Sequence, residues 1–436
     1  MSLLPQSRRS RIGWAAAASI GVGFCVGMMR RGEATPAMIA QGRELFMHEW
    51  SVDDPLAAGD GLGPVFNERS CVACHFQGGV GGSGPRAATV NTFEIVDPER
   101  PRQLISGVVH KEATSEAHRE DFGQVRERFG VANVVERHRI DSVCGGPRTV
   151  TVTKTNPIIP HVVDSPALFG LAVIESISDW TLVSGNAAKQ LSDTAAAFRG
   201  DFRRGGRGVY RMVDGDVGRF GWKGQFADVE SFVASACAME LGLGNSRVAQ
   251  PLPGEHRGDR DATPDMTDEQ LDALVAFVRS LPRPVQVLPA DASERAEVVH
   301  GEAVFEEVGC AECHIRQLGD VDRIYTDFKL YELGTELSGG GDDGGFGYGF
   351  GSSTRTETLF DWPAHLPHAD DWQTPPLWGV ADSGPYLHDG SAATLEAAIN
   401  RHGGDARESR KSFRGRSVAD RRALVRFLES LKAPTL

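Results

Sequence analysis

Two short runs of this sequence combine cysteine and histidine at a spacing that attaches haem. Each run has the pattern Cys-x-x-Cys-His, in which two thiols can bond to the vinyl groups of a c-type haem and the imidazole can bind the iron. A Cys-x-x-Cys pair alone would also suit a redox dithiol or half of a zinc site, but the following histidine and the second copy disfavour both. We therefore predict two covalently bound haem c groups. The residues are Cys71, Cys74 and His75 in the first run and Cys310, Cys313 and His314 in the second.

The two motifs lie in segments of the chain that repeat each other. Thr267 and Gln270 form a capping-box pattern that opens a predicted helix running toward Pro284, with apolar residues at helical spacing. Ser417 opens an equivalent helix running to Pro434, and the matching residues lie at a constant offset of 150 positions. This likeness predicts an internal duplication, with one buried stripe on each helix.

The beginning of each half repeats as well. Gly42 with Phe46, and Gly301 with Phe305, mark a predicted helix before each haem motif. A cytochrome c domain has this order: a first helix, the haem motif, loops, and a last helix that packs across the first. We therefore predict a mostly α fold of two cytochrome c-like domains with long loops, each carrying one covalent c-type haem.

The predicted boundary between the domains is a proline-rich stretch at residues 282–289. Segments 76–160 and 180–218 are predicted to be irregular insertions in the first domain, with strand character only near residues 149–155. The glycine-rich run 338–353 is predicted to be a surface loop. Its Gly and Asp content could also suit a calcium-binding loop, but the sequence matches no calcium-loop pattern. The predicted domains are residues 35–285 and 290–436.

The N-terminus has the pattern of a targeting segment. Three arginines precede an uncharged run over residues 12–29, and two more follow it. This run is long for a signal peptide and just long enough to span a bilayer. Residues 1–34 are therefore predicted to be either a signal peptide cleaved after Ala34 or an uncleaved anchor in the inner membrane. Both alternatives place the body in the periplasm or elsewhere outside the cytoplasm, where bacteria attach haem covalently.

The charge of the chain constrains its partners. The formal net charge is −13, and because residues 1–33 contain five arginines and one glutamate, residues 34–436 have a charge of −17. Strong acidity argues against nucleic acid and anionic membrane surfaces as partners of the body. It would attract a small basic redox protein, such as a cationic cytochrome, although it would equally keep an exported protein soluble.

Four further runs resemble a known family. Residues 372–380 (WQTPPLWGV) and 384–390 (GPYLHDG) resemble the C-terminal domain of bacterial di-haem cytochrome c peroxidases. Residues 219–223 (RFGWK) and 402–404 (HGG) are closer to the related bacterial di-haem oxidoreductases, a peroxidase-like family. The resemblance covers nearly all of the chain after residue 40, apart from the insertions.

The resemblance implies different roles for the two haems. In the peroxidases the N-terminal haem meets hydrogen peroxide on an open distal side, and the six-coordinate C-terminal haem passes electrons to it. A tryptophan between the haems corresponds to Trp222, for which a buried core indole is the alternative. A distal glutamate corresponds to Glu240, where it would act as a general acid and base; a solvated charge at a helix end is the alternative. Glu175 is a weaker candidate for the same role.

The sixth ligand of the second haem departs from the family. The peroxidases have a methionine at the position of His402, and this sequence has no methionine after Met266. We therefore expect His314 and His402 to bind the second iron together, which gives a low-spin haem of lower potential than a Met-ligated one. Competing ligands in this domain are His365, His368 and His388.

Two assignments stay open: the ligand on the distal side of the first haem, and the pairing of the remaining cysteines. Cys144 and Cys237 would suit a disulfide in an oxidising compartment, or two isolated thiols. The side chains that could reach the first iron are Met47, His48, His110, His118, His138, His161 and Met239.

The predicted function is that of an exported di-haem oxidoreductase that takes electrons at the C-terminal haem and reduces a small oxidant at the N-terminal haem. A non-enzymatic electron carrier, with both haems six-coordinate, is one alternative. An oxidase of an organic or protein substrate, as in the amine-dehydrogenase maturation enzyme of the wider family, is another.

Overall fold

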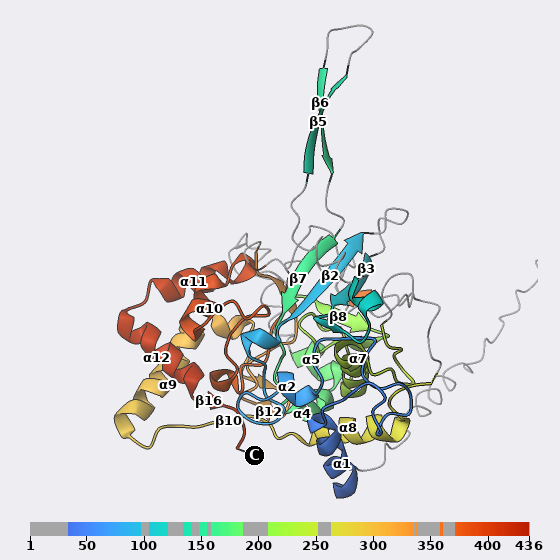
Figure 1. Ribbon diagram of the computed structural model, residues 1–436. Helices are drawn as coiled ribbons and strands as arrows, with labels where there is room; N and C mark the ends of the chain where they lie inside the picture. Colours follow the sequence, from blue (N-terminus) through green and yellow to red (C-terminus); the bar gives the residue numbers. More distant parts are fainter. Residues whose placement is uncertain are drawn as a thin grey trace, which may run out of the picture.

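The computed structural model contains helices and short strands in two groups that meet along the middle of the molecule (Figure 1). The predicted targeting segment lies outside the described residues, apart from Ala34. No helix in the part of the chain that is described is both long and apolar enough to cross a membrane. The structure describes residues 34–96, 104–120, 134–140, 148–154, 158–185, 208–251, 263–334, 337, 358–360 and 371–435.

Two crossed helix pairs form the framework, one in each half. Helix α1 (Pro36–Met47) packs against α8 (Asp268–Ser280), and α9 (Ala292–Glu307) packs against α12 (Val418–Glu429). Both hydrogen bonds of the predicted capping box at Thr267 are present. The four helices confirm the predictions made from the repeats.

A glycine and a phenylalanine form the contact in the first pair. Gly42 is buried where α1 meets α8, and a Cβ atom there would overlap the carbonyl oxygen of Ala273. One turn later the ring of Phe46 lies 5.2 Å from that of Phe277. Glycine is required because the two backbones touch at this point.

The second pair repeats these contacts residue by residue. A Cβ atom at Gly301 would overlap the carbonyl oxygen of Ala423, and the ring of Phe305 lies 5.4 Å from that of Phe427. Ala423 and Phe427 stand 150 positions after their counterparts in α8. The predicted duplication is therefore also a duplication of packing.

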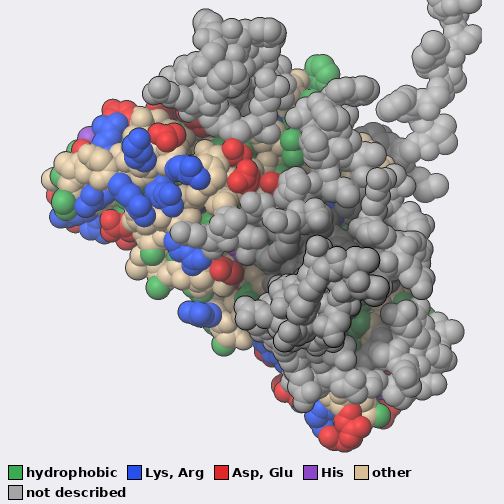
Figure 2. Space-filling view, turned by 90° about the horizontal axis from the view of Figure 1, so that it is seen from above, with side chains coloured by type: hydrophobic (Ala, Val, Ile, Leu, Met, Phe, Trp, Pro, Cys, Tyr) green, Lys and Arg blue, Asp and Glu red, His purple; other side chains and the backbone are tan. Residues whose placement is uncertain are grey.

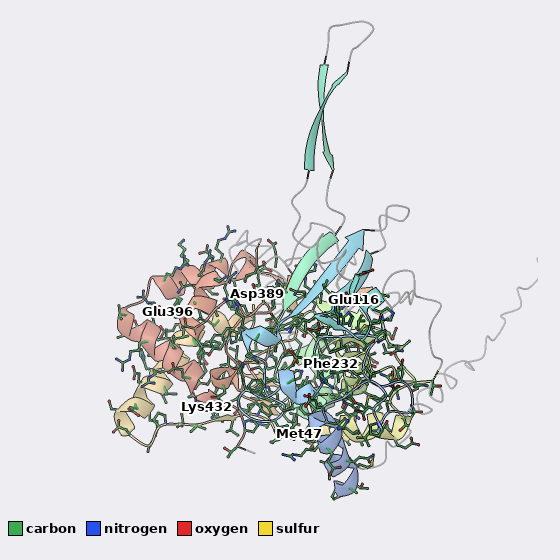
Figure 3. The ribbon with its side chains drawn as sticks, in the orientation of Figure 1. Met47, Glu116, Phe232, Asp389, Glu396 and Lys432 are labelled. Atoms are coloured by element: carbon green, nitrogen blue, oxygen red, sulfur yellow. The ribbon has the colours of Figure 1, made fainter. Side chains whose placement is uncertain are left out.

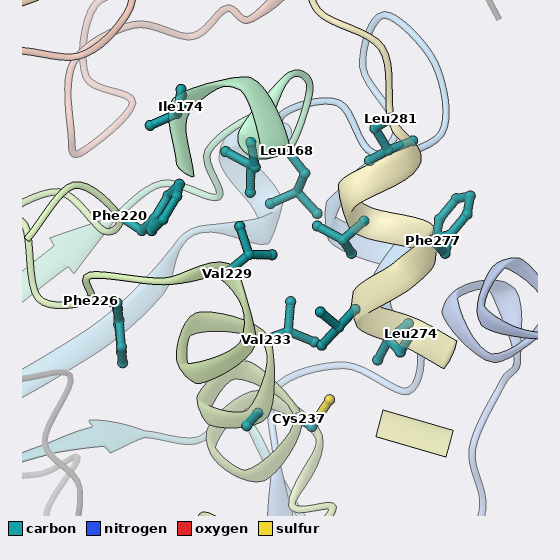
Figure 4. Packing of buried hydrophobic residues seen from close by; sticks show 14 of the residues in the cluster. Leu168, Ile174, Phe220, Phe226, Val229, Val233, Cys237, Leu274, Phe277 and Leu281 are labelled. Atoms are coloured by element: carbon teal, nitrogen blue, oxygen red, sulfur yellow. The ribbon is translucent and has the colours of Figure 1, made fainter. Parts of the chain in front are cut away.

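A third helix, α7 (Val229–Leu241), lies in the core of the first half. Asp228 caps its first turn, and Gly242 ends it in the left-handed conformation. Buried residues occur all round this helix, which is typical of an interior helix. Figure 4 shows Val233 and Cys237 of α7 near Leu274 of α8.

The first half contains more β structure than the sequence predicted. Segment 76–160 was expected to be irregular except near 149–155, but strands β3, β2 and β7 form an antiparallel sheet and β5 pairs with β6. β-branched residues in these strands favour extended backbone, and pairing between distant segments stabilises it. The strands are β2 (Val90–Val96), β3 (Leu104–Val109), β5 (Val134–Ile140), β6 (Arg148–Lys154) and β7 (Ile158–Val163).

Strand pairing joins the two halves. β14 (Thr358–Phe360), from the second half, pairs with β8 (Tyr210–Val213) from the first. β13 (Leu330–Glu332) pairs with β15 (Asp371–Gln373), and Val209 bridges to β13 at Leu330. The segments on both sides of the candidate site are therefore fixed to each other.

Short elements complete the described chain. They are β1 (Val65–Phe66), α2 (Cys71–Cys74), η1 (Arg86–Ala88), β4 (Glu112–Ala113), α4 (Leu171–Ser176), α5 (Asp179–Gly185), β9 (Asp216–Val217), β10 (Val285–Gln286), η3 (Cys310–Glu312), β11 (Gln317–Leu318), β12 (Val321–Asp322), η5 (Val380–Asp382), α10 (Leu395–Arg401), η6 (Gly404–Ala406), α11 (Arg407–Arg414) and β16 (Leu431–Lys432).

Candidate haem sites

The second Cys-x-x-Cys-His motif begins two residues after α9 ends. Its histidine, His314, directs Nδ1 to the carbonyl oxygen of Tyr325 at 2.9 Å. A donor at Nδ1 leaves Nε2 with the lone pair that binds a metal. Burial lowers the pKa of His314 to about 4, so the imidazole is neutral, as a metal ligand must be.

His402 faces the same site from the other side. It follows α10 directly, and its Nδ1 lies 2.9 Å from the carbonyl oxygen of Ala398, so Nε2 is again available. Burial lowers the pKa of His402, and His402 lies close enough to His314 to help lower the pKa of His314. The structure thus brings together His314 and His402, which lie 88 positions apart in the sequence.

A cavity of about 350 Å³ lies between the two halves and fits a c-type haem. Both cysteines of the second motif line it, as do His314 and His402. Most of the remaining wall is apolar and comes from both halves, for example Leu168 and Leu424. Two thiols, two neutral imidazoles and an apolar enclosure are the groups that a covalently bound haem requires.

The first motif repeats the local geometry of the second. His75 follows α2, and its Nδ1 lies 3.2 Å from the carbonyl oxygen of Gly82. Burial lowers the pKa of His75 to about 4. The ring of Phe46 lies 6.4 Å from the His75 ring, and in the other half Phe305 lies 6.3 Å from His314. The donor set at residues 71–75 therefore also fits a haem.

Glu240 lies in the last turn of α7, close to the first motif. Its Oε2 accepts a hydrogen bond of 2.6 Å from Nδ2 of Asn67. Its Oε1 is buried and has no hydrogen-bond partner in the described part of the protein. Burial raises the pKa of Glu240 to about 7, and its charge acts on the neighbouring Cys74. The carboxyl is therefore shielded from solvent, and it can both accept and release a proton near neutral pH.

Trp222 lies between the two sites. Its indole lines the cavity of the second motif and also packs against the small apolar cluster that contains Met239, the neighbour of Glu240 in α7. The indole Nε1 donates to the carbonyl oxygen of Asp164 at 2.8 Å, and the amide of Asp164 donates to the carbonyl oxygen of His388 at 2.6 Å. Asp164 thus connects the two repeated runs, 222–224 and 388–390.

Comparison with known proteins finds sequence similarity over parts of the chain. Residues 355–431 match the family model described as "Di-haem oxidoreductase, putative peroxidase". Two curated relatives match larger parts of the chain. The methylamine utilization protein MauG of Methylorubrum extorquens is 32% identical over 173 residues, which is 37% of this chain and 43% of MauG. The gamma subunit of hydrazine synthase from Kuenenia stuttgartiensis is 28% identical over 176 residues, 38% of this chain and 48% of that subunit.

The chain is thus similar to the di-haem oxidoreductases over residues 355–431, and to MauG over 37% of its length. Each match spans less than half of the curated relative. Among solved structures, hydrazine synthase of K. stuttgartiensis aligns with a TM-score of 0.26, 23% identity and coverage of 41% of this chain and 60% of the other. A MauG-like protein associated with microbial copper homeostasis aligns with a TM-score of 0.25, 19% identity and coverage of 42% and 61%. Both structural alignments are distant, so the similarity to the di-haem oxidoreductases depends on the sequence matches alone.

The competing candidates for these roles have other surroundings. His388 also lines the cavity, but its ring lies flat on Trp372, with 3.4 Å between centroids and 12° between planes. His365 and His368 lie outside the described residues. Glu175 forms an ion pair with Arg279, which donates to both carboxylate oxygens, so its position is structural.

The candidates for the distal side of the first haem are dispersed. Met47 ends α1 with 43% of its surface exposed (Figure 3). His48 is hydrogen-bonded to Asp54, and Nε2 of His110 lies 2.8 Å from the carbonyl oxygen of Met239. His118 and His161 are described, whereas the side chain of His138 and all of Cys144 lie outside the described residues. Cys237 is a free thiol in the core.

Two groups of the site were not predicted from the sequence. Asn67 orients Glu240, but 173 positions separate them and no local pattern links them. Lys223 stands where the peroxidases have aspartate, and it is fully buried with Nζ 4.3 Å from the centre of the Trp372 ring. Lys223 could be read from the sequence within the Trp-Lys-Gly run, but the contact between its ammonium group and the Trp372 ring could not.

Proposed function

We propose that this di-haem oxidoreductase is exported and reduces hydrogen peroxide at the haem held by residues 71–75, using electrons that enter at the haem held by residues 310–314. The haem irons supply the redox chemistry when bound, and the protein supplies ligands, access and protons. The buried carboxyl of Glu240 beside the first motif carries the proposal, because a peroxide-reducing site needs a proton carrier and an electron-transfer site does not.

Glu240 holds and moves the proton. With a pKa of about 7, its carboxyl is partly protonated at neutral pH, so it can take a proton from one oxygen of a bound oxidant and give it to the other. Asn67 fixes Oε2 through its hydrogen bond, which leaves Oε1 directed into the buried space. Asn67 is in turn held by the amide of Lys111, which donates to its Oδ1 at 3.0 Å.

His314 and His402 serve the other site. Two imidazoles would hold the second iron when haem is bound, which would suit it to exchanging electrons and not to binding an oxidant. Trp222 provides aromatic contact between the cavity of this haem and the cluster around Met239, and we assign it the electron relay. The electron donor is a small redox protein, for which the net charge favours a basic cytochrome. The proposed domains are residues 35–285 and 290–436.

An optical and EPR titration of the purified di-haem protein tests the proposal. Haem one should be high-spin and should bind cyanide or react with peroxide, whereas haem two should be low-spin and unreactive. If both haems are low-spin and neither binds cyanide, the protein is an electron carrier. If peroxide is consumed only when an organic or protein substrate is oxidised with it, the protein is an oxidase of that substrate. This oxidase activity is the second candidate function, because the chain matches MauG.

A further inference from the structure

The C-terminal helices carry a strong positive charge on an otherwise acidic protein. Between residues 407 and 426 there are eight Arg or Lys and two carboxylates, whereas the whole chain has a net charge of −13. Figure 2 shows Lys and Arg side chains gathered on the side of the molecule that these helices form. We call this surface the basic face. It consists of α11, the turn after it and the exposed side of α12; its basic residues are Arg407, Arg410, Lys411, Arg414, Arg416, Arg421, Arg422 and Arg426.

The basic face covers one wall of the second haem cavity. Ser409 and Arg410 line the cavity from α11, and the charge of Arg410 contributes to the lowered pKa of His402. Arg407 and Lys411 lie on the same helix and are exposed. A partner on the outer side is therefore separated from the cavity by one helix, about 10 Å across.

Carboxylates of this protein neutralise the face only in part. Lys411 pairs with Glu408 at 3.7 Å and Arg422 with Glu297 at 3.0 Å, and both cations are largely exposed. Exposed pairs of this kind are weak and exchange readily. Arg407 has no ion-pair partner among the described residues.

Further pairs lie at the margin of the face. Arg416 pairs with Glu307 at 2.8 Å and Arg421 with Glu396 at 3.8 Å. Arg426 pairs with Glu429 at 3.2 Å. With all of these pairs counted, Arg407, Arg410 and Arg414 of the basic face still have no ion-pair partner among the described residues.

An exposed apolar residue lies within the charged surface. Val418, at the start of α12, has 74% of its surface exposed, and arginines lie on both sides of it in the sequence. Protein interfaces commonly combine such apolar contact with a polar rim. The combination fits a protein partner better than a small ion.

We propose that the basic face is the docking surface for an acidic redox protein that delivers electrons to the second haem. This inference depends on the proposed function, in which electrons enter at this haem. It also reverses the charge of the expected donor, which the net charge of the chain alone would make basic. Salt screens charges beyond about 10 Å, so a docked partner responds to the basic face and not to the net charge of the chain. Complementary charge at a docking surface raises association rates by a factor of 10 to 10³.

The test compares two charge forms of one electron donor. The probes are oxidised cytochrome c with its native lysines, which is basic, and the same cytochrome after succinylation, which is acidic. Because the Met-ligated haem of cytochrome c has the higher potential, stopped-flow spectroscopy measures how fast each form oxidises the pre-reduced second haem, and titration calorimetry measures binding. The acidic form should exchange electrons with the second haem faster, and its rate should fall as salt is added. The double variant Arg407→Glu/Lys411→Glu should slow the acidic form about tenfold or more.

A matched control separates local from net charge. The double variant Arg43→Glu/Arg86→Glu makes the same change at exposed positions in the first half, and it should leave the rates within twofold of wild type. Equal slowing by both double variants would show that only net charge matters and would overturn the proposal. A faster reaction with the basic cytochrome would overturn it as well.

Two further measurements distinguish failure of the docking proposal from failure of the proposed function. Ascorbate with a small mediator should reduce the second haem at the same rate in every variant. If EPR shows that the first haem is reduced first, the proposed direction of electron flow is wrong, whatever the donor. Sedimentation with phosphatidylglycerol vesicles tests whether the basic face binds an anionic membrane surface instead. Tight binding to vesicles, without a preference for the acidic cytochrome, would overturn the proposal of a protein partner.

Discussion

Replacing Glu240 with glutamine should stabilise the protein in alkaline solution and leave its stability unchanged in acid. The pKa of Glu240 rises from its usual 4.5 to about 7 because the carboxyl is buried. Each tenfold change in proton affinity is worth about 1.4 kcal/mol, so ionising this carboxyl costs the folded protein about 3 kcal/mol. Glutamine has the same shape, its oxygen can accept the bond from Asn67, and it carries no charge to bury.

The pH dependence has a definite sign. The folded state binds this proton more tightly than the unfolded state, so wild-type stability falls, relative to Glu240→Gln, as the pH rises from about 4.5 to about 7. Above pH 7 the difference should level off near 3 kcal/mol in favour of the variant. Below pH 4.5 the carboxyl is protonated in both states, and the two proteins should unfold alike.

Urea denaturation of the haem-loaded proteins across this pH range measures the effect. Glu44→Gln, which removes an exposed carboxyl from α1, is the control and should show no such pH dependence. A difference between wild type and Glu240→Gln that is the same at pH 4 and pH 8.5 would refute the assignment of a buried, proton-binding carboxyl. Peroxide turnover is a second readout, and it should fall about 10²-fold or more when the proton carrier is lost.

Four further predictions concern ligands, relay and packing. His402→Ala should convert haem two from low-spin to high-spin in EPR, and an unchanged low-spin signal would exclude this ligand. Ala236→His should add a ligand to haem one, making it low-spin and unreactive toward cyanide; a haem that stays high-spin would show that this position does not reach the iron. Trp222→Phe should slow electron transfer between the haems in stopped-flow traces without changing either spectrum, whereas wild-type rates would exclude the relay. Gly42→Ala and Gly301→Ala should each lower the free energy of unfolding by about 1–3 kcal/mol or more, because a methyl group would displace a backbone carbonyl at each helix crossing. Thermal melting measures this loss, and an unchanged melting temperature would contradict the close backbone contact.

The framework could be predicted from the sequence because its signals are local. The capping box at Thr267, the apolar spacing of α8 and α12, and the glycine four residues before a phenylalanine are each readable within a few residues. The recurrence of these local patterns in the same order in both halves then links them into a fold. His402 could be singled out because methionine is missing from the end of the chain.

The remaining structure depends on contacts between distant segments. α7 is buried all round, so it lacks the one-sided apolar spacing that marked the other helices. β2 pairs with β7 more than 60 positions further along the chain, and propensity alone does not define either strand. The hydrogen bond between Asn67 and Glu240 likewise joins residues that are far apart in the sequence.

The difference between the two haem sites follows from the length of one repeated helix. Asp228 caps α7 four residues after the run 222–224 (WKG), and Thr394 caps α10 four residues after the similar run 388–390 (HDG), so the two helices correspond to each other in the duplication. His402 is the eighth residue after its cap, and the eighth residue after Asp228 is Ala236, whose methyl group cannot bind iron. α10 ends before His402 after 7 residues, whereas α7 has 13 residues and carries Glu240 one turn beyond Ala236, on the same helix face. Under the proposed function, one framework directs an imidazole toward the second haem and, from a longer helix, a carboxyl toward the first, so that ligand binding and proton transfer belong to different halves of the molecule.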